Sequence, residues 1–333
     1  MKAAVLTQLQ KPLELKTLAD PEPGAGQVRL RIHASGLCGT DLHVWHGHFP
    51  VKLPAVIGHE PVGVIDKLGT GVTKLRVGDR VGISWQQSGC GRCHYCQEGR
   101  EQFCRNGRSW VHNGGGNSQL MIGEASGCTL IPEGLAFESA APLFCAGFTI
   151  MSGYRNASPR SGDRVAIIGI GGLGHLALQV AKAMGHHTIA ITSTENKRAE
   201  ARKLGADEVL VVKDHAGKEL AAMGGADVVL STSNSMKQNS QVISGLRPEG
   251  RFVSMAVGAE KIEVDPMALL SGQIQIRGAS QNLRRDLVEI LDLAAAGKVR
   301  PVLELYPLAE INKAFTRLDQ GKVRYRAVVQ HEA

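Results

Sequence analysis

The chain lacks any long hydrophobic run, and none of its apolar stretches reaches the ~18 residues that a transmembrane helix requires. Residues 1–6 lack the longer apolar stretch and the cleavage site of a secretory signal and alternate like a strand, so we expect a cytoplasmic protein without a membrane partner. Basic residues are not clustered either. The formal net charge is +7, yet the densest groups are only Arg284-Arg285, Arg324 and Arg326. A nucleic-acid surface needs a clustered basic face, so nucleic acid is not an expected partner.

The length and the changing texture of the chain indicate two domains. At 333 residues it exceeds the usual size of one simple core. The first ~145 residues combine glycine, proline and short β-branched runs, which is typical of an irregular β-rich domain. From about residue 163, β and α patterns alternate, which predicts a doubly wound parallel sheet and hence an α/β protein.

Individual elements follow from the same patterns. In the first part we expect strands at 28–33, 62–68 and 80–84. In the second part we expect helices at 172–185, 196–204 and 283–296, an apolar helix at 140–152, and strands at 164–169, 187–192, 208–212, 226–231, 251–256, 274–278 and 327–330.

A glycine-rich turn directly follows the expected strand at 164–169 and opens the next helix. Glycines there permit a tight turn, close backbone approach to a pyrophosphate and close helix–strand packing, while the helix N-terminus offers free N–H groups to the anion. The pattern predicts a nicotinamide dinucleotide site; the alternative is a glycine-rich turn without a ligand. The G-x-G-x-x-G run consists of Gly169, Ile170, Gly171, Gly172, Leu173 and Gly174.

The strand after this turn does not end in an acidic residue, which would bind a free ribose 2′-hydroxyl. Small hydroxyl side chains and two cations follow it instead and suit a 2′-phosphate, so NADP(H) is favoured over NAD(H). In the alternative, the cations are solvated first-turn residues and Glu195 reaches the ribose. The favoured set is Thr192, Ser193, Thr194, Lys197 and Arg198.

Six of the seven cysteines fall into two groups. The first is a C-x2-C-x2-C-x7-C run, and four thiolates at this spacing can surround one tetrahedral Zn²⁺ ion in a closed structural site. A disulfide interpretation conflicts with the expected compartment. An iron–sulfur site lacks a redox partner domain, and a nucleic-acid zinc ribbon has its paired cysteines further apart. The run consists of Cys90, Cys93, Cys96 and Cys104.

The second group is Cys38 and Cys145, with a Gly58-His59-Glu60 triplet between them. Three protein ligands with an open coordination position suit a catalytic zinc. Alone, Cys145 in an apolar helix would be a core residue, but together with Cys38 and His59 it becomes a candidate ligand. We therefore expect two zinc ions per chain.

The motifs together carry a family resemblance. Residues 38–43 read C-G-T-D-L-H, and residues 58–72 fit G-H-E-x2-G-x5-G-x2-V. With the four-cysteine run and the glycine turn, these strings closely resemble the zinc-dependent medium-chain alcohol dehydrogenases over nearly the whole chain. Residues 45–47 and 54–60 are similar to the yeast-type enzymes, and residues 192–198 and 321–326 to the NADP-dependent cinnamyl-alcohol and aldehyde-reductase branch.

The resemblance implies a GroES-like catalytic domain at 1–146 and 282–333 and a Rossmann domain at 147–281, assembled as a homodimer or homotetramer. It also implies a small alcohol or aldehyde as the substrate. An open alternative is a zinc-free quinone or enoyl reductase of the same fold, which has no use for the second cysteine group. A non-catalytic, lens-type structural protein is another, and it predicts a damaged site.

The same resemblance assigns roles around the open zinc site. Cys38, His59 and Cys145 would hold the catalytic zinc, with water or the substrate oxygen in the fourth position. Glu60 would lie close behind and occasionally replace water as a ligand. Asp41 would orient His59 through its other ring nitrogen.

Further roles concern the proton and the substrate. Thr40 would accept the alcohol proton, and His43 would pass it on to solvent through the nicotinamide ribose. Candidate apolar pocket residues are Phe49, Trp85 and Trp110. Phe49 takes the place of a bulkier tryptophan in yeast-type enzymes, which indicates tolerance for longer aliphatic or aromatic substrates.

Overall fold

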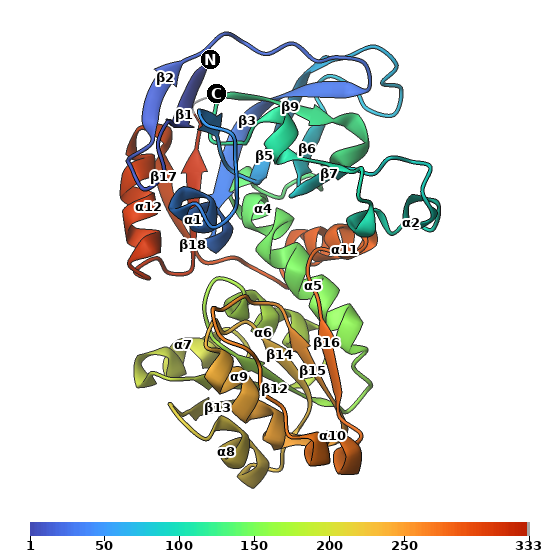
Figure 1. Ribbon diagram of the computed structural model, residues 1–333, viewed down its shortest axis with the longest axis vertical. Coiled ribbons are helices and arrows are strands. Elements are labelled where there is room, and N and C mark those ends of the chain that lie inside the picture. Colours follow the sequence, from blue (N-terminus) through green and yellow to red (C-terminus); the bar gives the residue numbers. More distant parts are fainter. Residues whose placement is uncertain (332–333) are drawn as a thin grey trace. The chain divides into compact units, whose positions relative to one another are not determined.

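The computed structural model describes residues 1–331, which form two compact units (Figure 1). The first, here called the β-rich unit, comprises residues 1–145, 283–295 and 301 onward. The second, the parallel-sheet unit, comprises residues 146–282 and 296–300. Among the described residues, no helix is long and apolar enough to cross a membrane.

A seven-stranded sheet forms the centre of the β-rich unit, in the order β10-β6-β5-β3-β18-β17, with β9 also paired to β3. The long strand β3 alternates buried and more exposed residues and buries Val28, Leu30 and Ile32 in the core. The expected strands at 28–33, 62–68 and 80–84 are confirmed. The strands are β3 (Gln27–Leu37), β5 (Glu60–Leu68), β6 (Arg80–Ile83), β9 (Leu120–Glu124), β10 (Cys128–Leu130), β17 (Leu303–Pro307) and β18 (Arg326–Gln330).

Smaller elements complete this unit. A three-stranded sheet has the order β2-β1-β4, and β7 pairs with β8. The short strands are β1 (Lys2–Leu6), β2 (Glu14–Thr17), β4 (Ala55–Val56), β7 (Gln86–Ser88) and β8 (Arg108–Ser109). The helices are α1 (Gly39–His46), α2 (His94–Gln97), α3 (Trp110–Asn113), α4 (Phe137–Ala140), α11 (Arg284–Ala295) and α12 (Ile311–Asp319).

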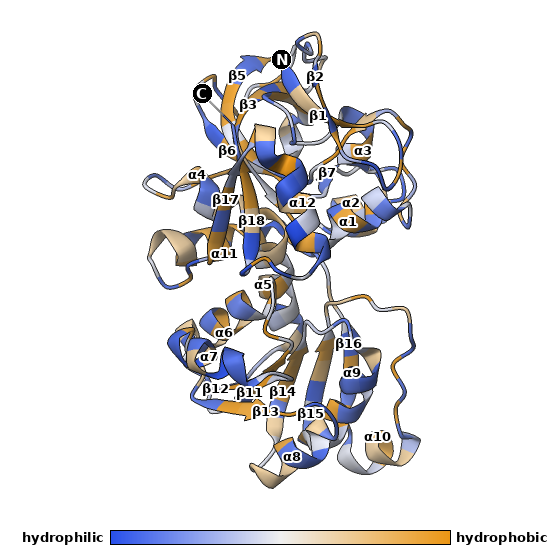
Figure 2. Cartoon of the chain, turned by 90° about the vertical axis from the view of Figure 1, so that its left-hand side faces the viewer, coloured by the Kyte–Doolittle hydropathy of each residue, from blue (hydrophilic) through white to orange (hydrophobic). Residues whose placement is uncertain are grey.

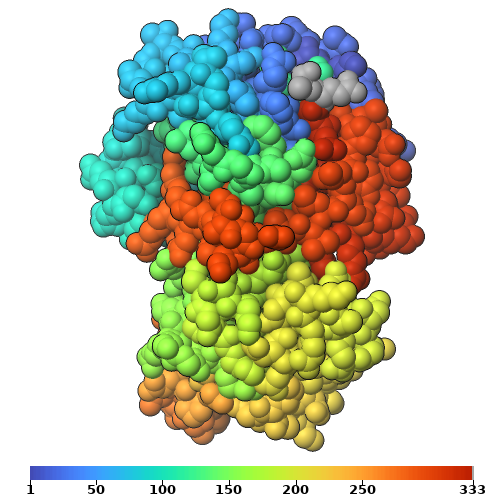
Figure 3. Space-filling model, turned by 180° about the vertical axis from the view of Figure 1, so that it is seen from behind, coloured from blue at the N-terminus to red at the C-terminus, as the bar shows by residue number. Residues whose placement is uncertain are grey.

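The C-terminal segment completes the sheet that the N-terminal segment begins. Strand β18 lies between β17, to which it is parallel, and β3, to which it is antiparallel. In Figure 3 the red C-terminal residues accordingly lie beside blue N-terminal ones. The closing strand at 327–330 is therefore confirmed, whereas β17 and α12 were not expected from the sequence.

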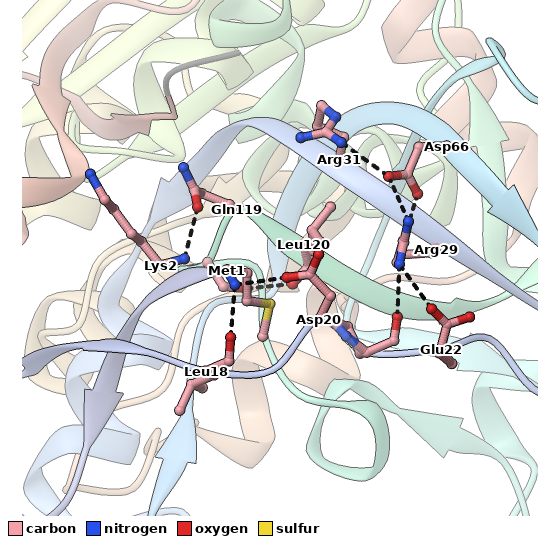
Figure 4. A network of polar contacts seen from close by, with 12 residues as sticks. Met1, Lys2, Leu18, Asp20, Glu22, Arg29, Arg31, Asp66, Gln119 and Leu120 are labelled. Atoms are coloured by element: carbon pink, nitrogen blue, oxygen red, sulfur yellow. Dashed lines mark hydrogen bonds and ion pairs between the residues drawn. The ribbon is translucent and has the colours of Figure 1, made fainter.

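Ion pairs tie the leading segment of the chain to the sheet (Figure 4). The α-amino group of Met1 lies 2.7 Å from Asp20 Oδ1. Arg29 on β3 pairs with Asp66 on β5 at 2.8 Å and with Glu22 at 3.3 Å. These contacts hold the segment between β2 and β3 against Met1 and the strand β3.

The parallel-sheet unit contains six parallel strands in the order β13-β12-β11-β14-β15-β16. Parallel strands need long crossover connections, which explains the alternating helices. Figure 2 shows mainly hydrophobic strands beside more polar helices, as expected for a sheet covered on both faces. The expected strands are confirmed as β11 (Arg164–Ile168), β12 (His187–Thr192), β13 (Glu208–Val211), β14 (Ala226–Ser231), β15 (Leu246–Ser254) and β16 (Gln275–Gly278).

Strand order places a topological switch at β11. The chain proceeds from β11 through β12 to β13 on one side, then crosses to β14, β15 and β16 on the other. Ligands of open α/β sheets bind at such a point, beyond the carboxyl ends of the strands. The helices are α5 (Ala146–Ala157), α6 (Gly174–Ala183), α7 (Arg198–Lys203), α8 (Ala216–Ala222), α9 (Met236–Val242) and α10 (Pro266–Gly272).

Candidate active site

Three donor atoms from distant parts of the sequence meet in the β-rich unit. His59 Nε2 lies 3.3 Å from Cys38 Sγ and 3.3 Å from Cys145 Sγ, and the two sulfur atoms are 4.0 Å apart. With a carboxylate oxygen of Glu60, all donors lie within 4.8 Å of one another. The separations fit one tetrahedral zinc with bonds of ~2.0–2.3 Å. Thus the structure brings together the three residues expected to bind catalytic zinc.

Cys38 is held at the junction of β3 and α1, where it caps the helix. Its sulfur accepts a hydrogen bond from the amide of Thr40 at 3.3 Å. The contact with the Cys145 sulfur and the nearby His59 hold the pKa of Cys38 well below its usual range, while the same contact and burial raise the pKa of Cys145. Two thiolates this close repel unless a cation lies between them, so the donor set fits a divalent metal.

Cys145 owes its position to a break between helices. The expected continuous helix at 140–152 is wrong. A short 3₁₀ turn (Ala141–Phe144) precedes Cys145, which has φ −124° and ψ −73°, and α5 starts only at Ala146. Pro142 lies in that turn and has no amide hydrogen to donate, which opposes a continuous helix there.

His59 is oriented by Asp41. Its Nδ1 atom lies 3.1 Å from Asp41 Oδ1, and the other oxygen of Asp41 accepts from the Cys38 amide at 2.9 Å. Burial opposes protonation of His59, but the negative charges of Cys38 and Asp41 outweigh it and raise the pKa of His59. When Nδ1 donates to the carboxylate, the lone pair of Nε2 faces the two sulfur atoms, the arrangement that metal-bound histidines use.

The glycine before His59 fixes the course of the chain. Gly58 has φ +113°, a left-handed conformation that favours glycine. A Cβ atom at Gly58 would lie 2.9 Å from the side chain of Asn117. The G-H-E string therefore has a local cause: only glycine fits the turn that presents His59.

Glu60 lies behind the cluster and pairs with Arg326 of β18. Its Oε1 is 3.9 Å from His59 Nε2. Burial raises the pKa of Glu60 to about 7, although Arg326 opposes this shift. Gly36 leaves room for the carboxylate, since a Cβ there would be 1.9 Å from Glu60 Oε2. Sequence reasoning missed Arg326; the one signal available was a charged residue at the start of a strand that is otherwise buried.

Aromatic rings form a continuous row from the cluster to α1. The ring centroids of His59 and Trp85 are 5.6 Å apart, those of Trp85 and Phe49 6.4 Å, and those of Phe49 and His43 5.4 Å. The third expected pocket residue, Trp110, is not part of this row. Its ring centroid lies 5.8 Å from that of Trp85, and the residue is only 2% exposed. It lies in the core and supports Trp85 from behind.

Two further expected residues lie on α1. Thr40 lies in its first turn, two residues after Cys38, and His43 lies in its last turn. Both are partly exposed. His43 Nδ1 lies 3.1 Å from His48 Nδ1. The helix thus carries both candidate proton-transfer residues on the segment that begins at a candidate metal ligand.

The four remaining candidate ligands form a separate cluster between β7 and β8. Cys96 Sγ lies 3.5 Å from Cys93 Sγ and 4.0 Å from Cys90 Sγ, and Cys104 Sγ accepts from the Cys90 amide at 3.3 Å. All four sulfur atoms lie within 4.8 Å of one another. Backbone amides of Arg92 and Cys93 lower the pKa of Cys90 to about 6. Four thiol donors with no open position fit a closed structural zinc site.

The glycine turn in the parallel-sheet unit has the geometry expected of a dinucleotide fingerprint. Gly169 follows β11 with φ +90°. A Cβ at Gly174 would lie 2.0 Å from the carbonyl oxygen of Gly169, so only glycine permits this approach of α6 to the strand. The expected helix at 172–185 is confirmed as α6, with Gly171, Gly172 and Leu173 in the turn before it.

A pocket lies beyond the carboxyl end of β11, within the parallel-sheet unit. Its walls include four of the expected cofactor residues: Gly169, Thr192, Ser193 and Lys197. The other lining residues were not assigned to the cofactor from the sequence: three are isoleucines of the glycine run and of the strands β11 and β12, and four lie further along the chain and belong to no motif. The full set is Ile168, Ile170, Ile191, Val212, Ala216, Ser233 and Gln238.

The two expected phosphate-binding cations differ in their surroundings. Lys197 Nζ donates to the carbonyl oxygen of Ile170 at 2.8 Å, which places it over the glycine turn. Arg198 instead donates to Glu195 Oε2 at 3.1 Å and to the Val209 carbonyl oxygen at 3.0 Å. Neither Arg198 nor Thr194 is among the pocket-lining residues.

Comparison with known proteins supports the same interpretation. Residues 24–133 match the family model "Alcohol dehydrogenase GroES-like domain", and residues 172–296 match "Zinc-binding dehydrogenase". An alcohol dehydrogenase of Geobacillus stearothermophilus is 40% identical over 335 residues, with 99% of each chain covered. An aldehyde reductase of Synechocystis sp. is 34% identical over 315 residues and 92% of each chain.

Solved structures of alcohol dehydrogenases have a similar fold. The alcohol dehydrogenase of the hyperthermophilic archaeon Aeropyrum pernix is similar with a TM-score of 0.90 at 31% identity, covering 99% of this chain and 100% of that one. The expected GroES-like plus Rossmann fold class is thereby confirmed. With the cysteine–histidine cluster and the dinucleotide turn in place, the chain is an oxidoreductase that belongs to the medium-chain zinc alcohol dehydrogenase family.

Proposed function

We propose that the protein is a zinc-dependent alcohol dehydrogenase or aldehyde reductase, which transfers hydride reversibly between an alcohol or its carbonyl compound and a nicotinamide dinucleotide. The observation that carries this proposal is the buried cluster of Cys38, His59 and Cys145, with Asp41 fixing the histidine tautomer. The names of the similar proteins, alcohol dehydrogenase and aldehyde reductase, support the same reaction class.

Each residue of the cluster has a defined task in this proposal. Cys38, His59 and Cys145 would hold the zinc, which when bound supplies a Lewis acid for the substrate oxygen. Asp41 keeps the Nε2 lone pair of His59 directed at the metal position. Glu60, anchored by Arg326, supplies a nearby carboxylate whose charge depends on pH near neutrality.

Proton movement would fall to residues of α1. The Thr40 hydroxyl would accept the proton of an alcohol, or return it to a carbonyl compound, because hydroxyl groups both donate and accept hydrogen bonds. His43 would exchange that proton with solvent, since an imidazole ring can both accept and donate a proton. The hydride itself belongs to the nicotinamide.

Metal content and turnover test this function together. We expect two zinc ions per chain by elemental analysis and NAD(P)-dependent oxidation of primary or secondary alcohols. Cys145→Ala should retain a folded chain but lose turnover. Unchanged turnover in that variant would contradict the assignment, and a zinc-free preparation with quinone reductase activity would favour the zinc-free class.

For the cofactor we propose NADP(H) over NAD(H). Thr192, Ser193 and Lys197 line the pocket, and none of them is acidic. Arg198 would have to leave Glu195 to contact a 2′-phosphate. Comparing kcat/KM for the two cofactors tests the preference, and a clear preference for NADH would overturn it. Lys197→Ala should reduce the ratio of kcat/KM with NADPH to kcat/KM with NADH more than Arg198→Ala does.

For the substrate we propose longer aliphatic or aromatic alcohols and aldehydes. Phe49, whose ring meets that of Trp85 edge to face, is smaller than the tryptophan of yeast-type enzymes. Activity confined to ethanol would contradict this. A panel of alcohols and aldehydes of increasing size is the direct test.

We also propose that the protein is a homodimer or homotetramer. Strand β16 forms one edge of the parallel sheet, and its Ile276 is 40% exposed. The neighbouring α10 exposes Met267 and Leu270. An unpaired strand edge with apolar side chains is a typical surface for pairing between copies of a chain. Light scattering of the purified protein tests this, and a monomer at micromolar concentration would refute it.

A further inference from the structure

Three histidines lie within six residues at the C-terminal end of α1, outside both cysteine clusters. They are His43, His46 and His48. Two of them face each other directly, with His43 Nδ1 3.1 Å from His48 Nδ1. His48 is exposed and His43 is partly exposed, so solvent and small ions reach the pair.

Backbone geometry holds the two rings together. Gly47 ends α1 in a left-handed conformation, φ +84°, which turns the chain back on the helix. The amide of His48 then donates to the carbonyl oxygen of His43 at 2.8 Å. On either side, the ring of Phe49 lies 5.4 Å from that of His43, and the ring of His46 stacks on His48 at 5.6 Å. The facing nitrogens are therefore prearranged.

A pair of facing ring nitrogens is also a pair of metal ligands. Between two neutral imidazoles only one proton lies on the Nδ1···Nδ1 line, donated by one ring and accepted by the other. If each ring instead carries its proton on Nε2, both Nδ1 lone pairs are available to one cation. Two imidazole ligands at ~2.0–2.1 Å in a tetrahedral arrangement place their nitrogens about 3.3 Å apart. The observed 3.1 Å is close to that separation.

Neighbouring charge favours a cation at this position. His46 Nε2 lies 3.0 Å from Asp319 Oδ1 on α12, which brings a carboxylate to the edge of the histidine group. Imidazole is a good ligand for Zn²⁺, Ni²⁺ and Cu²⁺ and a poor one for Mg²⁺ or Ca²⁺. Water would complete the coordination of an ion bound at this exposed pair.

We propose that His43 and His48 form an inhibitory site for a divalent transition metal, separate from the two cysteine clusters. Binding requires both Nδ1 lone pairs, so a histidine that is protonated in the free protein releases one proton. A metal on His43 Nδ1 prevents that ring from exchanging protons with solvent. The inhibition rests on the proton-transfer role proposed for His43, whereas the metal binding does not.

The test uses the zinc-loaded enzyme with Zn²⁺ as the probe. Equilibrium dialysis is expected to show one further zinc ion per chain, and turnover is expected to fall with the same midpoint. His48→Gln should raise both midpoints by about tenfold or more, because it removes one of two ligands. His112→Gln, a change of another exposed histidine outside the group, is the matched control and should leave both midpoints unchanged.

The possible outcomes are distinct. No additional zinc ion, or equal binding by His48→Gln and the unsubstituted protein, overturns the metal site. Zinc binding that depends on His48 while turnover stays unchanged establishes the site but refutes both the inhibition and the role of His43. Loss of turnover in the absence of added zinc, with normal cysteine-bound zinc, would mark His48 as part of proton transfer, and the dialysis still decides the metal site.

Discussion

At the scale of single residues, the candidate active site depends on side chains that are not themselves zinc ligands. Asp41 contacts both the backbone of Cys38 and the ring of His59, at 2.9 and 3.1 Å. This one carboxylate therefore positions two candidate ligands, the ring of His59 and the backbone of Cys38. Its effect on metal affinity should therefore be large for a residue outside the coordination sphere.

Asp41→Ala should weaken retention of one zinc ion by about 10–100-fold, because His59 loses the partner that selects its tautomer. Zinc content after stepwise treatment with a chelator measures this. Asp66→Asn changes another carboxylate of the same unit, paired with Arg29, and serves as the control. Equal zinc retention in the two variants would show that Asp41 does not orient the ligand.

Gly58 makes a second prediction at this scale. Gly58→Ala combines a left-handed φ of +113° with a contact of 2.9 Å to Asn117, whereas Gly71→Ala has φ +82° and open space. The control variant should cost about 1 kcal/mol of unfolding free energy, and Gly58→Ala about 2–3 kcal/mol. Urea denaturation measures the difference. If both variants lose the same stability, the Asn117 contact contributes nothing.

How far residue roles are predictable depends on whether the partner is near in sequence. Cys38, Asp41 and His59 belong to two short strings, so the patterns indicated them before the structure placed them together. Arg326 was not predicted, since it lies 266 residues from Glu60 and reaches it only because β18 pairs with β3. Sequence patterns do not encode a contact made by strand pairing over that distance.

At the scale of elements, the four-cysteine segment is a small structure with little core of its own. None of its four cysteines is fully buried, and its helical parts, α2 and a 3₁₀ turn at Glu101–Phe103, bury no residue. Arg100 lies 5.2 Å from the rings of Tyr95 and Phe103 and adds a modest cation–π contact. We therefore expect that zinc, if bound by these four cysteines, supplies much of the folding free energy of this segment.

Cys104→Ser should accordingly lower thermal stability more than it changes the chemical step. We expect zinc content to fall from two ions per chain to one, with Tm lowered by several degrees, because ~1–2 kcal/mol of local stability lost corresponds to that shift in a domain of this size. Calorimetry and single-turnover kinetics are the paired measurements. A variant that keeps its Tm but loses hydride transfer would reverse the assignment of the two zinc sites.

Elements themselves were predictable in proportion to their internal regularity. Strands β11, β12 and β14 are short aliphatic runs, and α6 follows a glycine turn, so their positions are explicit in the sequence. The prediction of a continuous helix at 140–152 was wrong, because the apolar composition of this segment gives no sign of the interruption around Pro142 and Cys145. That interruption positions Cys145, a candidate zinc ligand, so the wrong local prediction coincides with a candidate functional position.

At the scale of the whole molecule, the β-rich unit is built from both ends of the chain, with the parallel-sheet unit inserted between them in sequence. The C-terminal segment returns to the β-rich unit and supplies both β18 and Arg326. It also brings the described end of the chain, His331, beside the β3 residue His33, whose carbonyl oxygen accepts from the His331 amide at 3.0 Å. Closure of this unit therefore buries a titratable group.

His331 makes the stability of the β-rich unit depend on pH. Burial, and to a lesser extent the charge on His33, lower the pKa of His331 from 6.5 to about 4. The unfolded chain binds the proton of His331 more tightly than the folded chain does. Above pH 6.5 the residue is neutral in both states, and protonation of His331 takes nothing from the unfolding free energy. Unfolding free energy is lost as the pH falls from 6.5 towards 4. At pH 5 the loss is about 2 kcal/mol.

Replacing His331 by phenylalanine should remove this pH dependence. Denaturant unfolding of the β-rich unit measures how much unfolding free energy is lost between pH 7 and pH 5. This loss should be larger by about 2 kcal/mol in the unsubstituted protein than in His331→Phe. Because each protein is compared with itself at the two pH values, any change in unfolding free energy caused by altered packing cancels if it is the same at both. His112→Gln, at an exposed position, should keep the full pH dependence. If His331→Phe retains it as well, the acid sensitivity of this unit comes from other groups, and the buried histidine is protonated without cost to the fold.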